Sequence, residues 1–113
     1  MPRSLDRSRT LVLDWLRLEH RDPSFLASAV NLENRHGEIA QEFLKWADDS
    51  GFAYEIVKVD GIDGPAYEIH WTHRGASFVG FKQPPPERTP DDALLAGCAA
   101  LLENDWCRER LPA

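Results

Sequence analysis

Long hydrophobic runs are missing from this sequence. No apolar stretch reaches the roughly 18 residues of a membrane span, and the first residues lack the apolar core of a signal peptide. The only cysteines, Cys98 and Cys107, lie on roughly opposite faces of one expected helix, too far apart for a disulfide. We therefore expect reduced thiols, no membrane contact and a cytoplasmic location.

Positive charge is also scarce. Thirteen basic against nineteen acidic residues give a formal net charge of -6, the wrong sign for a protein that neutralises a row of phosphates. We therefore do not expect nucleic acid as a partner. The excess of Arg over Lys indicates a bacterial or phage source.

Motifs of known catalytic or ligand-binding sites are absent too. His70 and His73 stand three apart on an expected strand, so they point to opposite faces and do not form a metal site. The segment 60–64 resembles part of a calcium loop but lacks its ligand pattern, so we interpret it as a turn. We expect no catalytic residue, no metal and no cofactor, while an enzyme whose site is assembled in space stays an alternative.

The aromatic and aliphatic residues that are present suffice for one core, so residues 1–113 are expected to form a single domain. Residues 1–36 are predicted to be a helical extension and residues 37–107 an α-β-β-β-α core. Helical spacing of apolar residues predicts helices over 8–20 and 22–34 and a third from Glu38 to about Asp49.

The pattern then changes to a period of two residues, which predicts strands over 53–59, 66–73 and 76–82. Three prolines at 84–86 end the expected sheet. A capping Thr89 with Pro90 behind it predicts a final helix to about Cys107, packed on the sheet. The fold class is thus α+β: N-terminal helices, a three-stranded antiparallel meander and a C-terminal helix, in the order α-α-α-β-β-β-α.

The expected sheet has apolar residues on both faces. Tyr67, Ile69 and Trp71 share one face of the middle strand, but the first strand places either Tyr54 with Ile56 or Val57 with Val59 on the other. Such a surface should be covered. We expect the N-terminal helices to cover it, or else a second copy in a homodimer.

Residues 39–102 resemble the double-stranded RNA-binding domain, which has the layout α-β-β-β-α. The similarity is carried by Tyr54, by Gly64-Pro65-Ala66-Tyr67, by Trp71 and by the alanine-rich segment 96–100. That family binds phosphates with a lysine-rich start of its last helix, whereas this one starts with Asp91 and Asp92. The resemblance therefore implies a degenerate member that binds proteins. A winged helix, with a wing made by the strands, is a competing architecture.

These observations favour a small acidic, non-catalytic protein-interaction module. The negative charge makes a regulator or inhibitor of a nucleic-acid-handling protein one form of this hypothesis. A protein partner with a basic surface is implied. An alternative is a structured-RNA-binding domain with weakened phosphate contacts. The candidate partner contacts are Asp48, Asp49, His70, His73, Arg74, Asp91 and Asp92.

Overall fold

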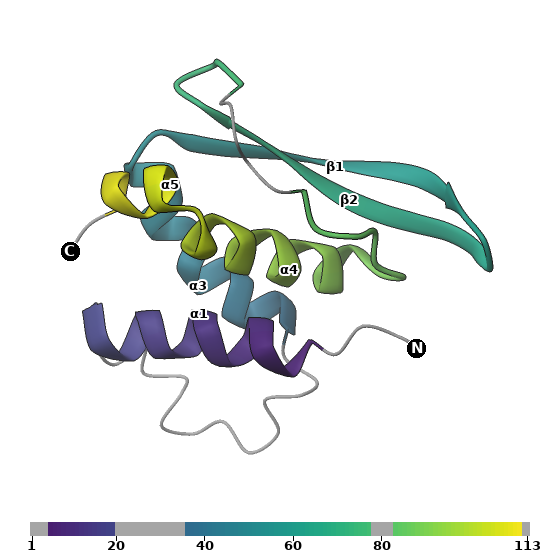
Figure 1. Ribbon diagram of the computed structural model, residues 1–113, viewed down its shortest axis with the longest axis horizontal. Coiled ribbons are helices and arrows are strands. Elements are labelled where there is room, and N and C mark those ends of the chain that lie inside the picture. Colours follow the sequence, from purple (N-terminus) through teal and green to yellow (C-terminus); the bar gives the residue numbers. More distant parts are fainter. Residues whose placement is uncertain (1–4, 20–35, 78–82, 112–113) are drawn as a thin grey trace.

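The computed structural model describes residues 5–19, 36–77 and 83–111 of the chain, and these parts form an α+β arrangement (Figure 1). The α+β class is thereby confirmed. In chain order the elements are α1 (Asp6–Glu19), α3 (His36–Asp49), β1 (Phe52–Gly61), β2 (Gly64–His73), α4 (Pro90–Glu103) and α5 (Asp105–Arg110). None of these helices combines the length and the apolar character needed to cross a membrane.

Helix α4 lies at the centre of the molecule. The β1–β2 hairpin lies on one side of it, and α1 and α3 pack on the other (Figure 1). Thr89 caps the helix, because its side-chain oxygen accepts a hydrogen bond of 3.1 Å from the main-chain nitrogen of Asp92. Almost every residue of α4 from Ala93 to Leu102 is buried, so this helix joins the layers into one core.

The hairpin packs closely on α4 because the helix has glycine where the strand crosses it. A Cβ atom at Gly97 would lie 2.9 Å from the Cβ of Ile69, so only glycine fits at this distance. The indole nitrogen of Trp71 donates a hydrogen bond of 3.1 Å to the carbonyl oxygen of Gly97. Ile69 and Trp71 are thus fixed on the inner face of the hairpin, the face that points to α4.

The register of the hairpin decides which side of β1 faces inward. Tyr54 lies opposite Trp71 and Ile56 opposite Ile69. Since directly opposite residues share a face, Tyr54 and Ile56 also lie on the inner face. Val57 belongs to the outer face.

The expected three-stranded meander is wrong, because the sheet of the described residues has two strands, β1 and β2. After β2, a turn at Arg74 and Gly75 brings Ala76 back onto His73 in a single bridge. The segment 83–87 then runs beside β2, but its three prolines have no N–H group for a ladder. Much of the expected third strand, residues 78–82, lies outside the described residues.

Two further predictions concern helices. The final helix, expected from Thr89 to Cys107, is interrupted at Asn104, whose extended main chain ends α4 and whose side chain caps α5. The side-chain oxygen of Asn104 accepts a hydrogen bond of 3.0 Å from the main-chain nitrogen of Cys107. This cap would be lost if the helix continued through Asn104. The helix expected over 22–34 lies outside the described residues.

The described N-terminal helix does not cover the outer face of the hairpin. Helix α1 packs on α3 and α4, below the layer that carries the hairpin (Figure 1). Its Val12 and Leu16 are fully buried in the common core. All of the described helices therefore lie on the inner side of the sheet. Homodimerisation stays a prediction.

Candidate functional site

The seven candidate contacts of the sequence analysis do not form one surface. Asp48 and Asp49 end helix α3, whereas Asp91 and Asp92 begin helix α4 beside the start of α3. A helix rises 1.5 Å per residue, so about 17 Å separates the two pairs along α3. The carboxylates therefore act as two groups rather than one.

Asp92 has a structural partner inside the protein. Its Oδ1 lies 2.8 Å from Nδ1 of His36, and Nε2 of His36 lies 3.5 Å from a guanidinium nitrogen of Arg9. Because a guanidinium can only donate, Nε2 accepts and Nδ1 carries the proton that is donated to Asp92. This chain of contacts joins the starts of α3 and α4 to α1.

His73 and Arg74 lie at the other end of the hairpin, close to the end of α3. Nε2 of His73 donates to the carbonyl oxygen of Ser50 at 2.9 Å, and its ring packs on Phe52 and Trp106. The main-chain nitrogen of Arg74 donates to the oxygen of Gly51 at 2.8 Å. His73 therefore holds the strand end in place, while the Arg74 side chain is exposed.

His70 is separate from both groups. It lies on the outer face of β2, half exposed, with its Nε2 2.9 Å from a carboxylate oxygen of Glu68. The exposed pair has the geometry of an ordinary surface contact, which contributes little to stability.

The two thiols are poor nucleophiles. Cys98 and Cys107 are buried and free. Burial raises the pKa of the Cys98 thiol, and it raises the pKa of Cys107 to about 11, with Arg110 acting in the opposite direction. Both stay protonated near neutral pH. Within the described residues, no three metal-ligating side chains lie together.

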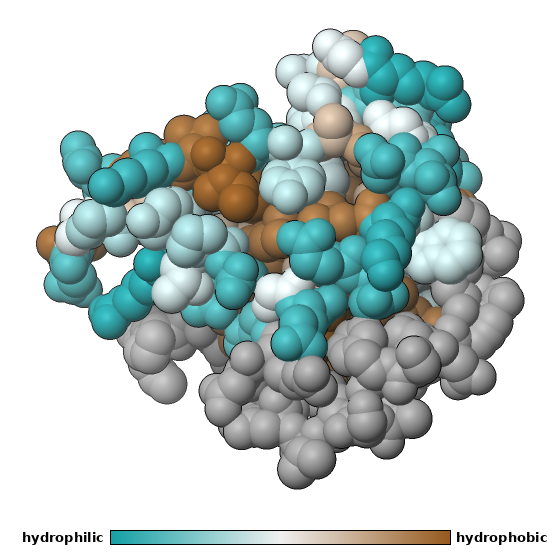
Figure 2. Space-filling model, turned by 180° about the vertical axis from the view of Figure 1, so that it is seen from behind, coloured by the Kyte–Doolittle hydropathy of each residue, from teal (hydrophilic) through white to brown (hydrophobic). Residues whose placement is uncertain are grey.

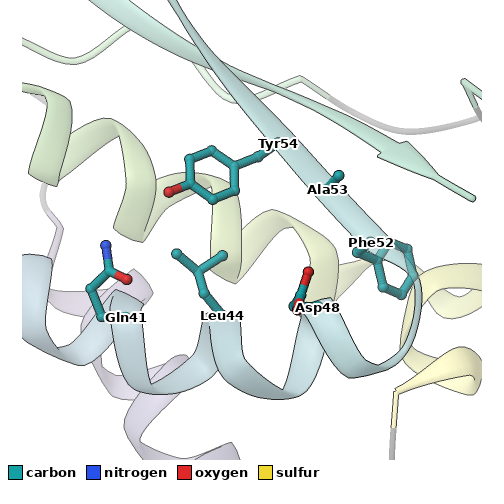
Figure 3. Close-up of a pocket in the computed structure, with 6 residues that line it drawn as sticks. All are labelled: Gln41, Leu44, Asp48, Phe52, Ala53 and Tyr54. Carbon is teal, nitrogen blue, oxygen red and sulfur yellow. The ribbon is translucent and has the colours of Figure 1, made fainter. Parts of the chain in front are cut away.

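A groove runs between α3 and β1, and we call it the α3–β1 groove (Figure 3). Its volume is about 260 Å³. Successive turns of α3 supply one wall and the beginning of β1 supplies the other. The lining residues are Gln41, Leu44, Asp48, Phe52, Ala53 and Tyr54.

A second hollow of about 420 Å³ continues along α3 toward its start, and Gln41 lines both. Glu38, Glu42 and Asp91 line it together with one cation, Lys45, which lies 3.0 Å from Glu42. We call the four carboxylates of the two hollows the acidic rim: Glu38, Glu42, Asp48 and Asp91. Of the charged residues that line the two hollows, four are carboxylates and one is a lysine.

Two large apolar side chains of β1 are exposed. Tyr54 is 39% exposed and Ile56 is 38% exposed, although both are on the inner face of the hairpin. Their neighbours Ile69 and Trp71 are covered by α4, which packs mainly on β2 and much less on β1. Figure 2 shows apolar surface on the hairpin and toward the middle of the same view, bordered by hydrophilic residues.

The sequence analysis missed this groove, and it included only Asp48 and Asp91 of the acidic rim. A signal was present, since the alternation of β1 offered Tyr54 with Ile56 as one of two possible apolar pairs. Which pair would be exposed depended on the position of α4.

Known proteins offer no match for this chain, whether as family models, curated sequences or solved structures. The resemblance to the double-stranded RNA-binding domain therefore stays a prediction.

Proposed function

We propose that this protein is a non-catalytic interaction module that binds a basic part of a partner protein along the α3–β1 groove. One observation carries the proposal: the α3–β1 groove and the hollow next to it combine the acidic rim with apolar lining residues, among them the exposed Tyr54. Exposed apolar side chains bordered by polar ones are typical of protein-binding sites. The buried thiols give no support to covalent catalysis.

The charge of the rim specifies the kind of partner. Carboxylates attract a basic surface and repel acidic ones, which favours correct encounters and suppresses wrong ones. The net charge of -6 adds to the attraction of a basic partner, because the whole chain is acidic. Proteins that bind nucleic acid have basic surfaces. The proposal therefore includes the case in which this protein inhibits such a partner by occupying its basic surface.

The test compares three forms of the tagged protein in affinity capture from the lysate of its host, after nuclease treatment. In the groove variant, Glu38→Gln, Asp48→Asn and Asp91→Asn remove three rim charges with little change of shape. The control variant removes the same charge from other surfaces by Asp14→Asn, Asp63→Asn and Glu109→Gln.

We expect a protein that is retained by the wild type and the control variant and lost from the groove variant. Identical sets of retained proteins from all three forms would refute the proposal. Retention that disappears with nuclease in every form would instead favour the alternative of RNA binding.

A further inference from the structure

The two edges of the hairpin are in different states. The edge of β2 is occupied by the chain itself: Tyr67 exchanges two main-chain hydrogen bonds with Glu87, of 2.8 and 2.9 Å. The side-chain nitrogen of Gln83 donates to the oxygen of Ile69 at 2.8 Å. Both of these contacts leave β2 on the side away from β1.

These bonds determine which groups of β1 point outward. In an antiparallel pair, opposite residues alternate between exchanging hydrogen bonds and pointing their main-chain groups away from each other. Tyr67 points away from β1, so its opposite residue, Lys58, points away from β2. By the same alternation the N–H and C=O groups of Ile56 and Tyr54 also point outward. We call this set the β1 edge: the outward main-chain groups of Tyr54, Ile56 and Lys58.

Among the described residues, none forms a main-chain hydrogen bond to the β1 edge. Unpaired strand edges are templates for the pairing of another strand, and proteins commonly block them. Within the described parts of the chain, main-chain pairing blocks only the β2 side. The same three residues direct their side chains to the inner face, where Tyr54 lines the α3–β1 groove.

We propose that the β1 edge accepts an extended basic segment of a partner protein as a third strand, an inference that rests on the proposed function. The segment would bond to the outward groups of Tyr54, Ile56 and Lys58, which span about 14 Å of strand. Alternate side chains of the segment would point into the α3–β1 groove. Strand addition of this kind obtains affinity from the main chain and specificity from alternate side chains.

Charge decides between this occupant and a second copy of the chain. A segment that enters the groove passes Asp48 at its border, with Glu38 and Asp91 farther along α3. Lysine or arginine in its groove-facing positions would complement these carboxylates. Two copies joined at their β1 edges would bring two acidic rims and two net charges of -6 together, which opposes self-pairing.

The experiment uses a displayed library of random twelve-residue peptides, selected on the full chain. Two variants then test the peptides that bind. Lys58→Pro removes an outward N–H that the β1–β2 ladder does not use, and proline is tolerated at such edge positions. Lys58→Ala removes the same side chain and keeps the N–H, so it is the matched control.

We expect basic peptides that bind the wild type and Lys58→Ala within about twofold of each other and bind Lys58→Pro at least about tenfold more weakly, the effect of one lost hydrogen bond. A second measurement does not depend on the folding of a variant. Methylation of successive main-chain nitrogens of a selected peptide should weaken binding at every second position only.

Peptides that bind Lys58→Pro as well as Lys58→Ala, and show no alternating effect of methylation, would overturn strand addition. If the groove variant still lost them, the proposed function would stand without it. A selection without any enriched peptide would count against both. Sedimentation that finds a dimer of the wild type and a monomer of Lys58→Pro would make a second copy the occupant and overturn the choice of a basic segment.

Discussion

Replacing Gly97 by alanine tests the close contact of α4 and the hairpin, because two effects of opposite sign compete. Alanine is favoured over glycine inside a helix by about 1 kcal/mol. Against this, the new Cβ would lie 2.9 Å from Cβ and 3.0 Å from both Cγ atoms of Ile69. Carbon atoms in contact normally lie about 3.5–4.0 Å apart, so helix and strand would have to separate by roughly 0.5–1 Å.

Ile69 cannot avoid the new atom by rotation, since its own Cβ is among the contacts. Overpacking of this kind costs about 1–3 kcal/mol. The separation would also lengthen the bond of 3.1 Å from the Trp71 indole to the Gly97 oxygen, whose loss costs about 1 kcal/mol. The contact outweighs the helix preference, so Gly97→Ala should lower the free energy of unfolding by about 2 kcal/mol.

Urea unfolding followed by circular dichroism measures this difference. Ala100→Gly, at a half-buried position of the same helix, is the control for helix preference and should cost about 1 kcal/mol. Adding Ile69→Ala to Gly97→Ala removes both Cγ atoms, so the double variant should be more stable than the sum of the single effects predicts. A Gly97→Ala protein that is more stable than the wild type would refute the reasoning.

Three further predictions concern other contacts. Thr89→Ala should lower stability by about 1 kcal/mol in urea unfolding through loss of the α4 cap, and Thr89→Ser should restore most of it; equal losses in both would contradict the capping role. His36→Ala should cost about 1–2 kcal/mol, because it breaks the contact with Asp92, while His70→Ala on the outer face should cost less than about 0.5 kcal/mol; similar losses would show that the contact contributes nothing. Because burial raises the pKa of the Cys107 thiol, the unfolded chain ionises at lower pH than the folded protein. The stabilisation of the folded protein by the protonated thiol is therefore complete below pH 9 and is lost as the pH rises toward 11. Unfolding of Cys107→Ala should therefore depend less on pH between 9 and 11 than that of the wild type, and parallel curves would exclude this effect.

Much of the local structure follows from the sequence because its causes are local. Helical spacing of apolar residues predicts α3 close to its observed bounds, and the capping Thr89 with Pro90 predicts the start of α4. The alternation of Tyr67, Ile69 and Trp71 correctly assigns one shared face of β2, on which Ile69 and Trp71 are buried. Each of these features depends on residues within about one turn or one strand.

The errors concern partners that are distant in the sequence. A suitable alternation over 76–82 indicated a strand but could not show what would lie beside β2, where Gln83 and Glu87 make the contacts. Asp92 appeared in the sequence as an exposed carboxylate at a helix start. It contacts His36, which is 56 positions away.

The sequence by itself determined the net charge, helix α3, the start of α4 and the two strands of the hairpin, since spacing and composition set these directly. Only the tertiary structure decided the candidate site. The crossing of Gly97 over Ile69 sets where α4 lies, and this position covers Ile69 and Trp71 while leaving Tyr54 and Ile56 exposed. The groove beside them exists because α3 and β1 pack on the same central helix, and packing of this kind depends on the whole chain at once.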